Sequence, residues 1–152
     1  MPWAASEPLR PIERAALITS WNDEAARGGG IALGCFLGEE LIGSTGLHRR
    51  RPDPGSLEIG YWLAADHTGF GYATELTFVL AEEAFTHAEI THVDLYCDVA
   101  NAPSAAVAER AGFTQLAVSL DERGVLSENS SGLERHFRLE RGSLDPGWRR
   151  RF

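Results

Sequence analysis

Apolar and polar residues follow two different periods along the chain, and the changes of period mark the expected elements. Short apolar runs between glycine-rich turns predict strands at 31–37, 41–48 and 57–63. Apolar residues three to four positions apart predict a helix that begins near Ser6 and another over about 72–87. Further along, the pattern predicts a strand at 92–99, a short helix at 101–113, and two strands near 114–121 and 134–140.

Two of these elements indicate which side chains form the core. The helix 72–87 carries an apolar stripe of Tyr72, Leu76, Leu80 and Ala84, with Val79 beside it. The strand 92–99 alternates cleanly, with Val93, Leu95, Cys97 and Val99 on one face and Asp94, Tyr96 and Asp98 on the other.

The order of the elements, α-β-β-β-α-β-α-β-β, predicts an α/β fold with a mixed, mostly antiparallel central sheet and helices on both faces. The length of 152 residues indicates a single domain over residues 1–152. Residues 141–152 are expected to form a flexible tail.

The net charge of −8 limits the classes of molecule that the chain is expected to bind. An acidic surface attracts cations and repels anions, and the chain has no basic stripe suited to nucleic acid. Two short basic clusters, 48–51 and 148–152, run against this trend, and the second is expected to be a solvated tail. No apolar run approaches the ~20 residues of a membrane span, and the first ten residues lack a secretion signal. These features predict a cytoplasmic monomer or homodimer with no membrane or nucleic-acid partner.

The two cysteines, Cys35 and Cys97, lie far apart in strand-like runs and form no zinc-binding spacing. Buried free thiols are therefore expected, with no disulfide and no metal.

The segment HTGFGYATE, residues 67–75, places Gly69, Gly71 and Ala73 at alternate positions just before helix-forming sequence. The first amides of a helix have no internal partners and carry the positive end of its dipole. Bare backbone there lets an anion reach them, which predicts a phosphate site. A tight turn with close helix packing would explain the same glycines. A P-loop is excluded because the chain contains no lysine, and the motif stands in the wrong place for a dinucleotide fold.

Together, LEIGYWLAADHTGFGYATE (57–75) and NAPSAAVAERAGF (101–113) resemble the GNAT superfamily of acyl-CoA N-acyltransferases. The likeness runs from about Trp3 to Phe137 and is most like the branch that acetylates ribosomal-protein N-termini. It implies the GNAT fold, with acetyl-CoA as acyl donor and an amine as acceptor. The family's first strand and first helix are missing from the expected elements.

The resemblance also implies a coenzyme site. Main-chain amides of the loop would hold the pyrophosphate, and Thr68 departs from the family's Gln or Arg. Beyond the loop, the strand 57–63 would part from the strand 92–99, and the pantetheine arm would pair there with main chain. Asn101 matches the family asparagine that contacts the arm, although a helix cap would explain it too. The implied binding residues are Trp62, Leu63, Ala64, Thr68, Gly69, Phe70, Gly71, Tyr72, Ala73, Thr74, Asn101 and Ser104.

The reaction implied is attack of a neutral amine on the thioester carbon, with a backbone N–H near Trp62 or Leu63 as oxyanion donor. Glu58 is the candidate base, although a strand carboxylate paired with an arginine is an equal alternative. Asp94, Tyr96 and His48 are reserves. Ser104 matches a serine frequent in this branch, and an ordinary first-turn helix residue would explain it equally well.

One departure concerns the leaving thiolate. Many relatives protonate it with a tyrosine four residues before the glycine of the second motif, and that position is Ala108 here. Solvent or Ser104 could suffice, because a thiol has a pKa of about 8.5. The alternatives to an N-terminal acetyltransferase are acetylation of a small-molecule amine and a non-catalytic acyl-CoA-binding module.

Overall fold

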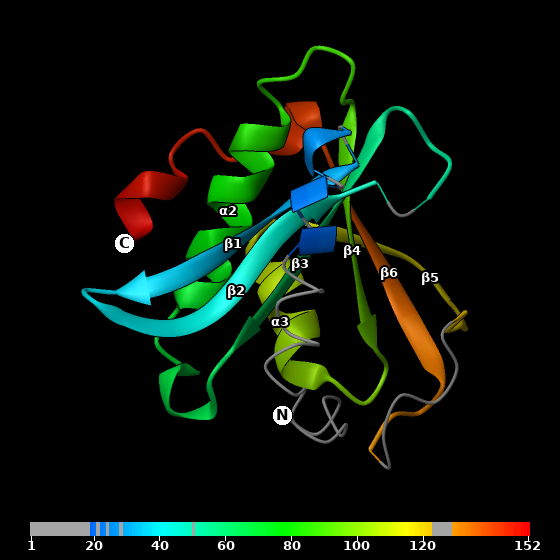
Figure 1. Ribbon diagram of the computed structural model, residues 1–152. Coiled ribbons are helices and arrows are strands. Elements are labelled where there is room, and N and C mark those ends of the chain that lie inside the picture. Colours follow the sequence, from blue (N-terminus) through cyan, green and yellow to red (C-terminus); the bar gives the residue numbers. More distant parts are fainter. Residues whose placement is uncertain (1–18, 21, 24, 28, 50, 123–128) are drawn as a thin grey trace.

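Six strands form one sheet in the order β1-β2-β3-β4-β6-β5 (Figure 1). The computed structural model describes residues 19–20, 22–23, 25–27, 29–49, 51–122 and 129–152. The strands are β1 (Gly30–Leu37), β2 (Glu40–His48), β3 (Ser56–Leu63), β4 (His92–Asp98), β5 (Thr114–Leu120) and β6 (Leu133–Glu140). The predicted strand positions are confirmed to within about two residues.

All neighbouring strands run antiparallel except β3 and β4, which are parallel. Parallel neighbours need a crossover connection. Helix α2 (Tyr72–Ala84) lies in that connection, after a short 3-10 helix, η1 (Ala65–His67). This arrangement brings the end of β3 and the start of α2 to one edge of the structure.

Helices α2 and α3 (Ala102–Arg110) pack against the same face of the sheet. Their side chains Phe78, Ala81 and Ala108 join Ile59, Leu95 and Phe137 from the strands in one buried cluster. Both cysteines are buried and free, as predicted. The helix predicted from Ser6 falls mostly outside the described residues. None of the described helices is long and apolar enough to cross a bilayer.

The buried face of α2 is rotated from the predicted stripe, because Thr77, Phe78 and Ala81 are buried and none of them belongs to that stripe. Leu80 and Ala84 lie in the main core, and Tyr72 and Leu76 pack on a smaller cluster around Ile42. Val79 is 42% exposed, so its assignment beside the stripe is wrong. At 3.6 residues per turn Val79 lies about 160° around the helix from Ala81, away from the buried face.

Residues 141–152 are packed against the domain, in place of the expected flexible tail. They form two short 3-10 helices, η2 (Arg141–Ser143) and η3 (Trp148–Arg151). Trp148 is buried and stacks on Phe78 of α2, with ring centroids 5.4 Å apart. In Figure 1 the segment, coloured red, runs along α2.

Candidate active site

Strands β3 and β4 separate halfway along their length. Their parallel pairing covers only Ser56 with His92, Leu57 with Val93, and Glu58 with Asp94. Beyond this point β3 continues to Leu63 and β4 to Asp98 without pairing to each other. Main-chain groups on facing strand edges need partners, so the gap can accept an extended ligand that adds main-chain-like hydrogen bonds.

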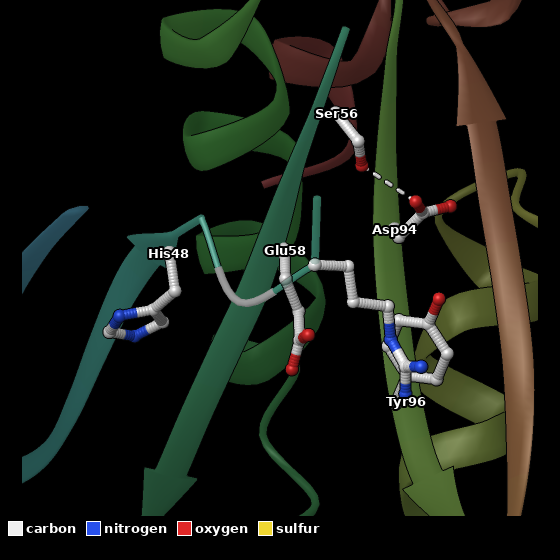
Figure 2. Close-up of a pocket in the computed structure, with 6 residues that line it drawn as sticks. His48, Ser56, Glu58, Asp94 and Tyr96 are labelled. Atoms are coloured by element: carbon white, nitrogen blue, oxygen red, sulfur yellow. Dashed lines mark hydrogen bonds between the residues drawn. The ribbon is translucent and has the colours of Figure 1, made fainter. Parts of the chain in front are cut away.

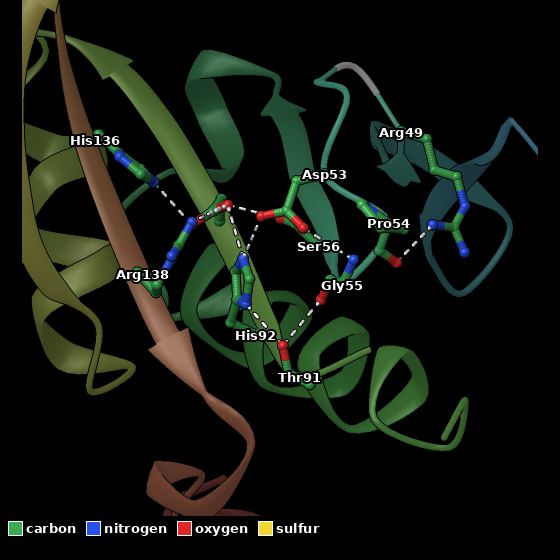
Figure 3. A network of polar contacts seen from close by, with 10 residues as sticks. Arg49, Asp53, Pro54, Gly55, Ser56, Thr91, His92, His136 and Arg138 are labelled. Atoms are coloured by element: carbon green, nitrogen blue, oxygen red, sulfur yellow. Dashed lines mark hydrogen bonds and ion pairs between the residues drawn. The ribbon is translucent and has the colours of Figure 1, made fainter. Parts of the chain in front are cut away.

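A polar network holds the paired end of the two strands together (Figure 3). Ser56 of β3 donates a hydrogen bond to Asp94 of β4 at 2.6 Å. Arg138 of β6 donates two hydrogen bonds to the same carboxylate, from Nε at 2.8 Å and from Nη2 at 3.0 Å. His136 Nε2 lies 2.8 Å from its Oδ1. Burial acts to raise the pKa of Asp94, but the bonds from Arg138, Ser56 and His136 outweigh it and lower the pKa below its usual value.

The network extends to the loop before β3. His92 Nε2 lies 3.1 Å from Asp53, and its Nδ1 lies 2.9 Å from the Thr91 hydroxyl. The amides of Thr91 and His92 both donate to the carbonyl of Gly55. The two strands are thus tied on one side of the Glu58–Asp94 pair, and they diverge on the other.

A cavity of about 1080 Å³ fills the gap and continues to the N-terminus of α2. Its wall includes side chains from β2, β3, β4, α2 and α3. They include most of the predicted site residues, namely Glu58, Trp62, Leu63, Thr68, Gly69, Gly71, Tyr72, Ala73, Thr74, Asn101 and Ser104. Of the predicted set, Ala64 and Phe70 are not among the lining residues, and Phe70 is 68% exposed.

The glycine turn opens onto this cavity. Gly69 and Gly71 have φ of +85° and +91°, a conformation that L side chains rarely adopt. A Cβ at Gly69 would meet nothing within 4 Å, and one at Gly71 would meet only the ring of Phe152 at 3.5 Å. Close helix packing therefore does not explain these glycines. They are explained by the positive φ of the turn and by the open space that leaves their backbone accessible.

The first turn of α2 presents main-chain amides at this point. Gly71 is the N-cap, and no side chain among the described residues caps the helix. Arg110 of α3 lines the cavity and reaches the Thr74 hydroxyl through Nε at 3.4 Å. The Thr68 hydroxyl donates to the carbonyl of Ala65 at 2.8 Å. Unpartnered amides, a helix dipole and an arginine favour an anionic ligand here.

The direction of each main-chain amide along β3 decides which of them can donate a hydrogen bond into the gap. The Ala64 amide already donates to the carbonyl of Ile42 at 2.8 Å. Main-chain groups alternate sides along a strand, so Trp62, opposite Ser44, also directs its amide toward β2. The amide of Leu63 therefore faces the gap, where it can donate to a ligand.

Two hydroxyls meet in the cavity wall. Tyr61 Oη and Ser104 Oγ are 2.7 Å apart, although they lie 43 residues apart in the chain. Burial raises the pKa of Tyr61 to about 12. Asn101 caps α3 by accepting from the Ser104 amide at 3.2 Å, as the capping alternative predicts. The cap uses only the carbonyl oxygen of the Asn101 side chain, and the residue also lines the cavity.

Glu58 projects from β3 between His48 of β2 and Tyr96 of β4 (Figure 2). Its side chain is buried, with 8% of the residue exposed, and it lines the cavity. Asp94 is the carboxylate that carries the bidentate arginine, and its lowered pKa makes it a poor base. Tyr96 is a poor base for a different reason. Burial and then the charge of Asp94 raise its pKa, so the phenol keeps its own proton at neutral pH and cannot accept another.

Ala108 faces the core with no exposed surface. The cavity lining on α3 includes Ser104 and Val107 but not position 108. Position 108 therefore contributes nothing to the cavity wall of this chain, and the hydroxyl that α3 places on that wall is Ser104.

Sequence reasoning missed Tyr61 and Arg110. Tyr61 has the parity of the core positions Ile59 and Leu63, so the pattern assigns its ring to the core and says nothing of its hydroxyl. Arg110 follows the lining residues Ala106 and Val107 by four and three positions, and only this helical spacing in α3 could have indicated a shared face. Within the described part of the chain, no group of three or more metal-ligating side chains is found.

Comparison with known proteins places these features in a family. The model of the acetyltransferase (GNAT) domain matches residues 1–114. YdaF of Bacillus subtilis (strain 168), a ribosomal N-acetyltransferase by name, is 33% identical over 102 residues, which cover 67% of this chain and 56% of YdaF. The chain therefore spans little more than half the length of that relative.

Solved structures share the fold. A crystal structure titled as a probable acetyltransferase has a TM-score of 0.80 and 27% identity, covering 93% of this chain and 78% of that one. RimL, a ribosomal alpha-N-protein acetyltransferase solved with coenzyme A, has a TM-score of 0.77 and 20% identity, covering 87% of this chain and 73% of RimL. At that identity the second match speaks for the fold alone.

Proposed function

Because the chain belongs to the GNAT acetyltransferase family, we propose that it moves the acetyl group of acetyl-CoA to an amine by direct attack on the thioester. One observation carries the proposal. A single cavity runs from the open glycine turn at the start of α2, along the gap between β3 and β4, to the buried carboxylate of Glu58. It has a place for an anion at one end and for a base at the other.

Acetyl-CoA fits this cavity by its chemistry. Its pyrophosphate suits the amides of residues 71–74 and the guanidinium of Arg110. Its pantetheine arm carries two amide groups that suit the unpaired edges of β3 and β4. The thioester then lies near Leu63, whose amide faces the gap and stabilises the carbonyl oxygen as it gains negative charge.

In the chemical step, the amine nitrogen bonds to the carbonyl carbon and the carbon–sulfur bond breaks, with its electron pair going to sulfur. Glu58 takes the proton that the amine loses, directly or through a water. Ser104 supplies a proton to the thiolate and recovers one from solvent. Tyr61, whose pKa is raised to about 12, stays protonated and donates to Ser104, which leaves the serine proton directed elsewhere.

We place a protein N-terminal amine first among acceptors. An α-amine has a pKa near 8 and is partly neutral at physiological pH, whereas a lysine amine near 10.4 needs more help from a base. The name of YdaF points the same way. The carboxylates Glu58, Asp98 and Asp121 on the cavity wall suit any cationic acceptor, so a small polyamine is the second candidate.

The test is thiol release from acetyl-CoA with peptides that begin with Ala, Ser or Met, beside spermidine and an aminoglycoside. We expect release with at least one N-terminal amine. Acetyl-CoA binding without release across the whole panel would instead support the non-catalytic coenzyme-binding module.

Substitution of Glu58 tests the base. Glu58→Gln should lower kcat/KM by about 10²–10⁴-fold, because Gln cannot accept the proton. Acetyl-CoA affinity should stay unchanged, because Glu58 lies at the acceptor end of the cavity. The loss should be larger for a lysine acceptor than for an α-amine. Asp94→Asn is the matched control, since it alters a neighbouring carboxylate that Arg138 already occupies. Full activity of Glu58→Gln with a lowered melting temperature would assign Glu58 a structural role.

A further inference from the structure

The basic cluster WRRRF, residues 148–152, is docked at the entrance to the phosphate end of the cavity. It lies outside the part of the chain that the family model matches, residues 1–114. Trp148 and Phe152 anchor it, since both rings pack on Phe78 of α2, with centroids 5.4 Å and 6.4 Å away. The anchors hold three consecutive arginines beside α2.

Contacts link this segment to the residues around the first turns of α2. Arg151 donates through Nη1 to the carbonyl of Arg110 at 3.4 Å. Arg110 in turn reaches Thr74, in the first turn of α2, and lines the cavity. The ring of Phe152 lies 3.5 Å from the position of a Cβ on Gly71. Arg151 lies over the Phe78 ring, 5.6 Å from its centroid, so Arg110 reaches the first turn of α2 and Arg151 lies beside the second.

The local charge differs from that of the chain as a whole. The net charge of −8 repels a polyanion such as coenzyme A. Arg149 pairs with Glu82 and Arg151 with Asp145, whereas Arg110 and Arg150 have no ion pair among the described residues. Both described pairs are substantially exposed, and such pairs are weak and can exchange partners. The cluster thus keeps a positive excess where the phosphates of a ligand would enter.

We propose that Arg110 and Arg151 bind the 3′-phosphate of coenzyme A, with the docked segment 148–152 serving to hold Arg151 in place. This rests on the proposed function, which places the pyrophosphate at the start of α2. The 3′-phosphate is carried by the same ribose as the pyrophosphate, so its site must lie within one sugar of the glycine turn. Arginine suits a phosphate because its planar fork can donate two bonds at once.

Calorimetry with coenzyme A and dephospho-coenzyme A, which lacks only the 3′-phosphate, tests the proposal. The wild-type chain should bind coenzyme A on the order of tenfold more tightly, as expected for a charge-assisted contact. Arg151→Gln and Arg110→Gln should reduce that preference. Arg151→Gln should leave the affinity for dephospho-coenzyme A within about twofold of wild type, because its target is absent from that ligand.

Arg149→Gln is the matched control. It removes the same charge from the same segment, but Arg149 pairs with Glu82, which lies 11 residues beyond Gly71 along α2, or ~16 Å at the helical rise. Its preference for coenzyme A should equal that of wild type. Melting temperatures identify any variant that fails to fold, and Trp148→Ala, which releases the anchor, should lose the same preference as Arg151→Gln.

The outcomes separate the two proposals. If wild type binds both ligands equally tightly, the acetyl-CoA assignment stands and the 3′-phosphate site is overturned. If Arg151→Gln weakens both ligands equally, or Arg149→Gln has the same effect, the specific role is overturned as well. If wild type binds neither ligand, the proposed function itself fails.

Discussion

Replacing Gly69 by alanine separates a ligand-binding glycine from a turn glycine. Its φ of +85° disfavours any L side chain, and a Cβ there would meet nothing within 4 Å. Gly38, in the turn between β1 and β2, is a matched control, because its φ is +62° and its Cβ position is equally open. The two sites differ in that Gly69 lines the cavity and Gly38 does not.

The conformational cost should be similar at both sites, at about 1–2 kcal/mol for an alanine in the left-handed region. For a domain of this size that corresponds to a fall in melting temperature of roughly 2–8 °C. At Gly69 the methyl group also enters the space of the pyrophosphate. Loss of one hydrogen bond to a charged group, about 1.5–3 kcal/mol, weakens binding by about 10- to 150-fold.

Thermal unfolding and acetyl-CoA calorimetry on the same samples measure both effects. Gly69→Ala should lose stability and affinity, and Gly38→Ala should lose stability alone. If Gly69→Ala binds acetyl-CoA as tightly as Gly38→Ala does, the glycine serves the turn only, and the phosphate assignment is refuted.

Three further predictions concern the same region. Gly71→Glu should abolish acetyl-CoA binding in a folded protein, because its carboxylate would occupy and repel the phosphate position; unchanged affinity by calorimetry would contradict this. Asp94 has a lowered pKa in the folded state, so its stabilising contribution is complete above the unfolded value of about 3.9 and disappears as pH falls through the lower folded value. Urea unfolding between pH 2 and 6 should show a steeper loss for wild type than for Asp94→Asn, and equal slopes would refute the assignment. Burial raises the pKa of Cys97 to about 11, so its alkylation by iodoacetamide at pH 8 should be much slower than that of a solvent-exposed cysteine. A mass-spectrometric time course can check this.

The local pattern predicted the six strands and the glycine turn because these depend on neighbours in sequence. Alternation in β3 and β4 follows from the strand period, and the positive φ of Gly69 and Gly71 is a local backbone requirement that glycine meets without help from distant residues. Spacing alone left two explanations for the glycine turn, a phosphate site and a tight turn with close helix packing. The resemblance to the family favoured the first and named coenzyme A as the ligand.

Pairings between distant elements could not be read in this way. The sequence favours Glu58 as the base and keeps Asp94 in reserve, but it contains no sign that Arg138 of β6 would bind the Asp94 carboxylate through two nitrogens. Tyr61 and Ser104 meet because β3 diverges from β4 and α3 approaches the gap, which no local signal contains.

The basic cluster at 148–152 shows the same division most clearly. By composition it is a solvated tail, since three consecutive arginines give no core-facing period. In the fold, Trp148 finds a flat partner in Phe78, and burying two aromatic surfaces outweighs the entropy of ordering a short segment. The sequence by itself determined the elements and the open turn, since these are set by backbone preference and short-range periodicity. The tertiary structure decided which carboxylate Arg138 binds, which hydroxyls meet and where the arginines lie, since those depend on contacts between elements that the chain order does not bring together.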